Sequence, residues 1–268
     1  MIFLLLLALA GPVCAETGFL AGQAQLAWQD RDKPGQTEQA IQLWKQAAQA
    51  EPNRAELWID LSRALGRAVR HAKTLQERQQ WADEALAAAQ KAVRITPVSA
   101  EAYAVYGEAL GQWANAHQGI HSLSRVHQAV EALEKAVALN PQYAYAHMLL
   151  AEFYRQSPRF FSIGDKTKAL EHARLAVEYG PAYAINHLVL AQAYLDKGMK
   201  KEGIAELRKI MSLSPPADAI PETRADQETA LAMLGSLGLK PAAETKTSSS
   251  REPPQCGQAA GYCSEETK

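Results

Sequence analysis

The residues best suited to metal chemistry are two histidines, His117 and His121, which stand four positions apart in the stretch AHQGIHS. On one helical turn, two imidazoles with this spacing can bind a zinc ion. The metalloprotease form of the motif has Glu directly after the first His, whereas this chain has Gln118. Gly119 between the two histidines favours a turn over a continuous helix. We therefore expect a solvated turn here, and a metal-dependent enzyme is kept as a remote alternative.

Other catalytic patterns are missing from the sequence. There is no Gly-rich phosphate loop, no Gly-x-Ser-x-Gly nucleophile motif and no Cys-x-x-Cys-His haem-attachment motif. His147 and His187 occupy the same position in two successive repeats described below, which favours a shared packing role. We therefore predict a protein that is not an enzyme and that carries no cofactor or metal.

The charge balance gives no reason to expect a nucleic-acid partner. Lys and Arg number 28 against 29 Asp and Glu, for a net charge of −1. Nucleic-acid binding requires a basic surface, and no basic, aromatic-interleaved patch is present.

The first fifteen residues are typical of an export signal. An apolar run from Ile2 to about Val13 is shorter than the roughly 20 residues that a transmembrane helix needs, and it suits the apolar region of a signal peptide. Small residues near Ala15 predict cleavage after it and export, most simply to the periplasm. The alternative is a lipoprotein anchored through Cys14.

If Cys14 leaves with the signal, two cysteines stay in the chain. Cys256 and Cys263 lie in the C-terminal tail with six residues between them. In an oxidising compartment they can close a small disulfide loop. Whether they pair is left open.

A recurring pattern organises most of the chain. Five segments, at 39–53, 84–98, 128–142, 168–182 and 202–216, each carry Ala or Gly followed at +4 and +7 by a small or apolar residue and at +12 by proline. The matching sets are Ala40/Trp44/Ala47/Pro52, Ala85/Ala89/Ala92/Pro97, Ala129/Leu133/Ala136/Pro141, Ala169/Ala173/Ala176/Pro181 and Gly203/Leu207/Ile210/Pro215. Small residues let two helices approach closely, and proline ends a helix. The pattern predicts a helix and then a turn in each segment.

Another helical segment follows each of the first four prolines, and large and small residues recur within it at fixed positions. They are Trp58/Leu61/Ser62/Leu65, Tyr103/Tyr106/Gly107/Leu110, His147/Leu150/Ala151/Tyr154 and His187/Leu190/Ala191/Tyr194. This arrangement resembles the tetratricopeptide repeat, a hairpin of two antiparallel helices. The resemblance implies an all-α, right-handed superhelical solenoid of about five hairpins over residues 16–216.

The spacing of the prolines predicts repeats of unequal length. Prolines at 52, 97, 141, 181 and 215 are separated by 45, 44, 40 and 34 residues, and 34 is the standard repeat length. The two longest repeats therefore have room for about three extra helical turns each. The 40-residue repeat places its extra residues in a loop from Pro158, and Asp165 is a good N-cap for the next helix.

The remaining segments complete the predicted domain organisation. Residues 1–15 form the signal peptide, and residues 217–239 are predicted to form an amphipathic helix that caps the array. Residues 240–268 are rich in Pro, Ser, Gly and charge, so we expect them to be disordered.

The tetratricopeptide resemblance also implies which side chains line a concave groove. Its N-terminal half is charged and includes Asp60, Arg63 and Glu108. Its C-terminal half is more apolar, and the candidate binding residues there are Tyr145, Met148, Leu149, Glu152, Arg155, Ile185, Leu188, Val189 and Gln192. An apolar patch rimmed by polar groups is typical of an interaction site. Two alternatives stay open: the patch binds a partner, or the C-terminal helix folds back and fills it.

Two stretches suggest a narrower branch of the family. The long early hairpins, FFSIGDKTKAL at 160–170 and ADQETALAMLGSL at 225–237 resemble the T-component proteins of TRAP-type transporters and the regulator-of-microtubule-dynamics proteins. The T-component resemblance implies an exported scaffold that forms homo-oligomers and binds a periplasmic solute-binding protein or an apolar small molecule. The alternative is a general envelope-assembly scaffold unrelated to transport.

Two adjacent aromatics, Phe160 and Phe161, fall in the loop of the 40-residue repeat. The inward positions of that repeat are already filled by other side chains, so these two are surplus to its packing. We expect them to cover the end of a neighbouring longer hairpin, or else to line a binding or oligomer contact.

Overall fold

The computed structural model describes residues 3–117, 119–157 and 164–239 of the 268-residue chain, with side chains from residue 15 onward except those of residues 120 and 121. All regular structure in this part is helical. The helices are α1 (Phe3–Gln29), α2 (Gln36–Ala50), α3 (Ala55–His71), α4 (Leu75–Ile95), α5 (Ala100–His117), α6 (Ile120–Leu139), α7 (Ala144–Gln156), α8 (Lys166–Tyr179), α9 (Ala184–Asp196), α10 (Lys200–Met211) and α11 (Ile220–Ser236).

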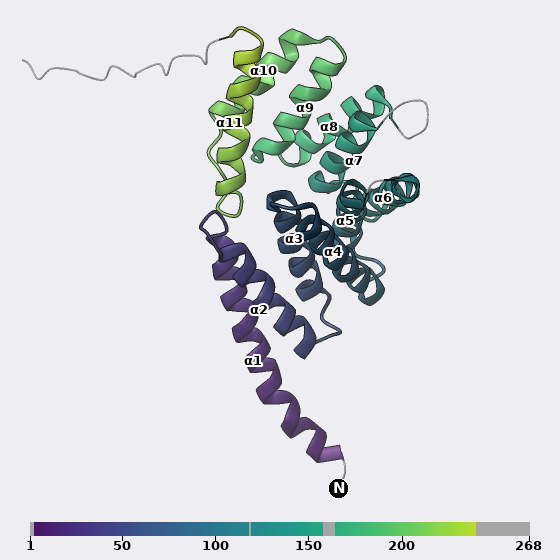
Figure 1. Ribbon diagram of the computed structural model, residues 1–268, viewed down its shortest axis with the longest axis vertical. Coiled ribbons are helices and arrows are strands. Elements are labelled where there is room, and N and C mark those ends of the chain that lie inside the picture. The colour runs from purple at the N-terminus through teal and green to yellow at the C-terminus, as the bar shows by residue number, and fades with distance from the viewer. Residues whose placement is uncertain (1–2, 118, 158–163, 240–268) are drawn as a thin grey trace, which may run out of the picture.

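Consecutive helices pair into five hairpins, α1–α2 through α9–α10, and neighbouring hairpins stack on one another (Figure 1). The odd-numbered helices α3, α5, α7 and α9 also contact each other in sequence, so they form the inner layer of the array. The predicted all-α solenoid with an additional C-terminal helix is confirmed.

Small residues at the repeating positions allow the two helices of a hairpin to pack closely. Ala40, Ala85, Ala129 and Ala169 are all at most 1% exposed. At Gly107 of α5, an added Cβ would lie 2.6 Å from Leu133 Cγ of α6 and 3.0 Å from the Ala129 carbonyl oxygen. The glycine is therefore required by helix contact rather than by backbone conformation.

The extra length of the two longest repeats is helical, as predicted. Helices α3 to α6 have 17 to 21 residues, against 12 to 14 in α7 to α10. The added turns form a small core of their own, in which Val69, Ala82 and Ala116 are buried and Trp81 and Trp113 pack against them. The ends of these long hairpins are thus covered by their own tryptophans.

The loop of the 40-residue repeat begins and ends where the sequence predicts. Helix α7 stops at Gln156, and the carboxylate of Asp165 accepts hydrogen bonds from the backbone N–H groups of Thr167 (2.8 Å) and Lys168 (3.2 Å) at the start of α8. Phe160 and Phe161 lie outside the described residues, so their predicted packing role stays a prediction.

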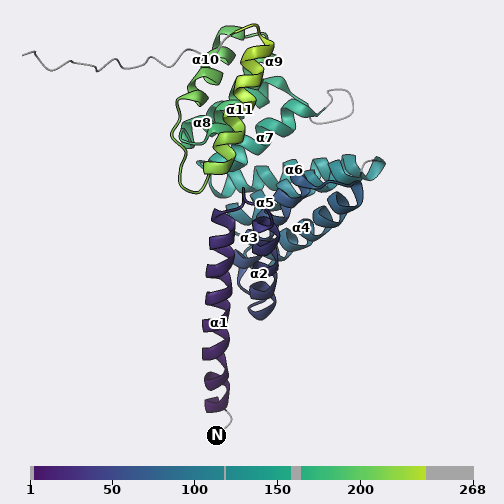
Figure 2. The same cartoon turned by 60° about the vertical axis from the view of Figure 1, so that its left-hand side comes forward.

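Helix α1 runs without interruption through the predicted cleavage point after Ala15. Its packing residues Ala24 and Ala27 belong to the same core as Ile41 and Trp44 of α2, whereas its N-terminal part extends beyond α2 (Figure 2). Within the described part of the chain, every helix is too short or too polar to traverse a lipid bilayer.

The last helix crosses the array instead of extending it. Helix α11 packs on α9 and α10, and its N-terminal end lies beside the turn between α1 and α2 (Figure 1). This placement brings residues about 190 positions apart into contact and closes the concave side of the solenoid into a ring.

Candidate protein-binding groove

The inner faces of α3 and α5 form the first part of a polar wall on the concave side. Arg63 of α3 pairs with Glu101 of α5 (2.7 Å) and with Asp60 one turn earlier (3.7 Å). Its guanidinium also donates to the phenol oxygen of Tyr143, which precedes α7 (3.4 Å). Side chains from three successive repeats therefore meet at one arginine, and the predicted charged N-terminal half of the groove is present.

A second polar contact joins the same three repeats two turns further along α3 and α5. Glu108 of α5 accepts hydrogen bonds from Arg70 of α3 (2.9 Å), from Gln112 (2.9 Å) and from the hydroxyl of Tyr145 of α7 (2.6 Å). Burial raises the pKa of the Tyr145 phenol well above its usual value, and the Glu108 carboxylate raises it further. The phenol therefore stays protonated and keeps donating to Glu108 at any physiological pH.

We call this surface, formed by Asp60, Arg63, Arg70, Glu101, Glu108, Tyr143 and Tyr145, the polar wall. Its side chains are held by one another yet reach solvent, since Arg70 is 51% and Glu101 47% exposed. Held side chains lose little further rotamer freedom on binding, which favours recognition of a polar partner.

The predicted apolar half of the groove is closed. Met148, Leu149 and Leu188 are 5–6% exposed and Val189 is 1% exposed. Leu188 belongs to a core with Ala230 and Leu234 of α11, against which Ile185 also packs. Of the two open alternatives, the structure matches the one in which the C-terminal helix folds back, for Leu188 and Ile185. Met148, Leu149 and Val189 are buried in a separate core that contains no α11 residue.

Helix α11 packs along one face of α9, formed by residues at helical spacing. Leu188 and the partly buried Leu195 pack in its core, and the amide of Gln192 contacts Met233 Sδ of α11 at 4.0 Å. The stripe at 188, 192 and 195 is the face that the repeat turns toward the groove. Gln192 thus contacts α11 instead of standing free for a ligand.

An ionic contact holds the other end of α11. Glu222, in its first turn, pairs with Arg31 after α1 and with Arg67 of α3 (2.9 Å to Arg67). The Arg31 guanidinium is 3% exposed, donates to the Trp28 carbonyl (2.9 Å) and the Asp218 carbonyl, and lies over the Trp28 ring. Burial raises the pKa of Glu222, but the hydrogen bonds from Arg31 and the charges of both arginines outweigh it and leave the pKa below its ordinary value. We call this three-residue contact the latch.

Two carboxylates face the interior of the ring without an ion pair to any described residue. Burial raises the pKa of Asp226 to about 7, with further contributions from Glu222 and Glu152. Burial also raises the pKa of Glu152, against the opposing charge of Arg155. Arg155 pairs with Asp196 of α9 at 3.5 Å. Both carboxyl groups are therefore harder to ionise than exposed ones.

His117, from the candidate metal pair, has a packing role. His117, the last residue of α5, stacks on Trp113 and bonds to Asp83 at 3.0 Å. Gly119, with a φ of 105°, forms the turn before α6 as predicted. The side chain of His121 lies outside the described set. Among the residues that are described, no group of three or more His, Cys, Asp or Glu side chains is arranged to hold a metal ion.

His147 and His187 make equivalent contacts, as their shared repeat position predicts. The Nε2 atom of each lies 2.9 Å from a proline carbonyl oxygen six residues earlier, that of Pro141 and Pro181 respectively. Each Nδ1 atom faces the second helix of the same repeat. His147 Nδ1 meets His172 at 2.9 Å, and His187 Nδ1 meets Glu206 at 2.6 Å. Both rings fix the first helix of a hairpin to its turn and to its partner helix.

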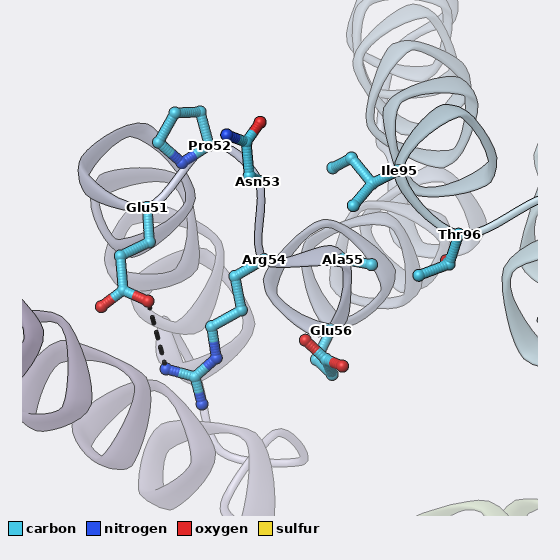
Figure 3. A pocket seen from close by; sticks show the side chains of 8 residues that line it. All are labelled: Glu51, Pro52, Asn53, Arg54, Ala55, Glu56, Ile95 and Thr96. Atoms are coloured by element: carbon cyan, nitrogen blue, oxygen red, sulfur yellow. Dashed lines mark ion pairs between the residues drawn. The ribbon is translucent and has the colours of Figure 1, made fainter.

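A hollow of about 490 Å³ lies at the turn between α2 and α3 (Figure 3). The C-terminal end of α4 supplies Ile95 and Thr96 on one side, and the turn and the start of α3 supply the rest, including the ion pair Glu51–Arg54 at 3.8 Å. Its wide opening and mixed lining fit a gap between two repeats better than an enclosed ligand site.

Several predicted features fall outside the described side chains. These are the possible disulfide between Cys256 and Cys263, the lipid attachment point Cys14 and the aromatic pair Phe160 and Phe161. Conversely, the latch is absent from the sequence predictions. Nothing in the segment RDKPGQ distinguishes Arg31 from any exposed loop arginine.

The stacked hairpins and the concave polar wall define the class: a tetratricopeptide-repeat scaffold of the kind that binds protein partners and is typically non-catalytic. Within this class, the chain belongs to the regulator of microtubule dynamics protein 1-3 family, whose model matches residues 23–157. A tetratricopeptide repeat model matches residues 186–216. No curated protein matches the chain in sequence.

Solved structures confirm the fold. The thermophilic tetratricopeptide protein TTC0263 of Thermus thermophilus superimposes with a TM-score of 0.61 at 21% identity, covering 80% of this chain and 99% of that one. Yeast Tom70 gives a TM-score of 0.50 at 15% identity, covering 82% of this chain and 41% of Tom70. At these identities the likeness extends to the fold alone.

Proposed function

We propose that this protein binds a segment of a partner protein along its concave face, with the polar wall as the primary contact. The observation that carries the proposal is the alignment of charged and tyrosine side chains from three successive repeats. They are fixed by mutual hydrogen bonds while Arg70 and Glu101 stay half exposed. A surface of this kind offers both donors and acceptors to a polar or charged peptide.

The location of the protein is a further part of the proposal. We infer export with cleavage after Ala15, supported by the apolar composition of residues 1–15. The α1 residues that pack on α2, Ala24 and Ala27, all follow this point, so the first hairpin keeps its packing after cleavage. Anchoring through Cys14 is the alternative. The mass of the mature N-terminal peptide distinguishes them: a chain starting at residue 16 supports cleavage, and a lipid-modified Cys14 supports anchoring.

The FFSIGDKTKAL and ADQETALAMLGSL stretches resemble the T-components of TRAP-type transporters. On this T-component hypothesis, the partner of the exported protein is a periplasmic solute-binding protein. The T-component hypothesis also predicts that the protein forms homo-oligomers and binds an apolar small molecule. An apolar molecule at Leu188 requires α11 to move, because α11 covers this side chain. A general envelope-assembly scaffold is the alternative. The identity of the captured partner decides between the two.

A photocrosslinking experiment tests the binding face. A photoreactive amino acid replaces Glu101 on the polar wall or, as the control, Arg208, which is exposed on α10. Capture of one protein from the Glu101 position alone supports the proposal, and Arg70→Glu should abolish it while Arg208→Glu leaves it unchanged. Equal capture from both positions, or capture that is indifferent to Arg70→Glu, contradicts the proposal.

A further inference from the structure

Helix α11 is held less extensively than the other helices of comparable length. It has 17 residues, as α3 does, but only Thr223, Ala230 and Leu234 are buried, against ten residues of α3. Its main helix contacts are with α9 and α10, and the latch and the exposed Arg224–Asp32 ion pair (3.6 Å) link it to the first repeats. Segments with few buried contacts open at lower free energy than the rest of a structure.

The connection to α10 is long enough for α11 to move away from the fifth hairpin. Residues 212–219 join the end of α10 to the start of α11 and include Pro215 and Pro216. Eight residues can span up to about 27 Å when extended. Leu207 and Ile210 of α10 are fully buried in a core that α9, α10 and α11 share, and the α9 residues Ala184, Leu188 and Ala191 stay with the hairpin when α11 leaves.

The departure of α11 would uncover a site with a defined chemistry. At one end lie two cations, Arg31 and Arg67, which now share one carboxylate, that of Glu222. At the other end lies the α9 stripe with Leu188, which now faces Ala230 and Leu234. A ligand for this site must therefore present a carboxylate in its first helical turn and small or apolar side chains 8 and 12 residues later.

From this geometry we propose that α11 is a resident, releasable occupant of the groove, and that the partner is an amphipathic helix with an acidic first turn that takes the place of α11. Arg31 and Arg67 would then recognise the partner's carboxylate, and the α9 stripe would bind its apolar face. This inference rests on the proposed function, since it specifies how a partner protein enters the concave face. It makes binding a competition between the partner and a segment of the chain itself.

The test uses a fluorescent synthetic peptide with the sequence of residues 217–239 and full-length protein in which Cys14, Cys256 and Cys263 are Ser. Gln192→Cys and Met233→Cys, whose native side chains touch, are joined by a short bis-maleimide to hold α11 in place. Glu222→Gln weakens the latch, and Glu228→Gln, an exposed change on the same helix, is the matched control.

We expect the Glu222→Gln protein to bind the peptide at least tenfold more tightly than the Glu228→Gln protein, because more of it has an open groove. The cross-linked protein should not bind the peptide. A peptide with Lys in place of Glu222 should bind at least tenfold more weakly. Binding that survives cross-linking, or that is insensitive to the Lys change, overturns the proposal. Dimers of the Glu222→Gln protein that grow with concentration and vanish on cross-linking would identify a second copy as the occupant and overturn the choice of a partner helix.

Hydrogen exchange separates this inference from the proposed function. Amides of α11 should exchange at least tenfold faster than those of α9. Equal protection of the two helices refutes a releasable α11, even if Arg70→Glu still abolishes partner capture. Conversely, fast exchange of α11 combined with partner capture that is indifferent to Arg70→Glu would retain the releasable helix and remove the polar wall as the primary contact.

Discussion

Replacing Glu222 by Gln tests whether the latch holds the ring closed. The change keeps the shape of the side chain but removes the charge that neutralises Arg31, which is 3% exposed. Removing one partner of a fully buried ion pair costs about 3–5 kcal/mol, whereas an exposed pair is worth about 0–1 kcal/mol. Glu222 is 35% exposed, and Arg31 keeps its bonds to the carbonyls of Trp28 and Asp218. We therefore expect a loss of about 2 kcal/mol in the docking free energy of α11.

Hydrogen exchange resolved by peptide is the suitable assay, because a repeat array need not unfold as one unit. A loss of about 2 kcal/mol corresponds to roughly 30-fold faster exchange in α11, since every 1.4 kcal/mol is a factor of ten. The control Glu228→Gln changes an exposed side chain and should alter exchange by no more than about twofold. Protection in α5 and α6, which are remote from the latch, should not change.

The pH dependence adds an independent test. The pKa of Glu222 is lower in the folded protein than its ordinary value of 4.5, so its charge stabilises the fold above pH 4.5 and this contribution is lost as the pH falls below it. The difference between wild type and Glu222→Gln should be largest near pH 5, decrease toward pH 8 as Asp226 ionises beside Glu222, and shrink toward pH 3. If Glu222→Gln matches Glu228→Gln at pH 7, or if the difference persists undiminished at pH 3, the latch does not hold α11.

Three further substitutions probe the interior, the helix contacts and a cap. Asp226→Asn should stabilise the protein by about 1–3 kcal/mol at pH 8 and by little at pH 4. Burial raises the pKa of this carboxyl to about 7, so its ionisation opposes folding as the pH rises from 3.8 to 7. Equal urea midpoints of the variant and wild type at pH 8 would contradict this. Gly107→Ala should destabilise the protein by about 1–3 kcal/mol through collision with Leu133, whereas Gly235→Ala, on an open surface of α11, should leave its stability unchanged. Thermal melts that rank the two variants oppositely refute the close-contact argument. Asp165→Ala should cost about 1 kcal/mol and Asp165→Asn much less, measured as amide protection at the start of α8; equal losses would exclude a capping role.

The repeat architecture could be predicted from sequence because its signals are local. The repeating pattern has small or apolar residues four and seven positions after an Ala or Gly, and a proline twelve positions after it. It lies within one helix and the turn that follows, so it locates the second helix of each hairpin and the end of that helix. Asp165 and Gly119 marked helix boundaries for equally local reasons: a side-chain cap and a left-handed φ. The extra turns of α3 to α6 followed from the spacing of prolines alone.

The state of the groove could not be predicted in the same way. The identity of the groove-facing positions on α9 followed from the repeat, but their exposure depends on where a later helix lies. Leu188 reads as an open apolar residue until α11 is placed over it. The pairing of Arg31 with Glu222 joins residues 191 positions apart and depends on the accumulated curvature of five hairpins.

The amino-acid sequence by itself thus determined the repeat class, the length of each hairpin, the helix boundaries and the charged character of the inner face, because these depend on interactions between residues close along the chain. Only the tertiary structure decided that α11 returns across the concave side, that Glu222 closes the ring on Arg31 and Arg67, and that Glu108 joins three repeats. These contacts form only when the whole array is assembled, since the angle between each hairpin and the next sets where the last helix meets the first.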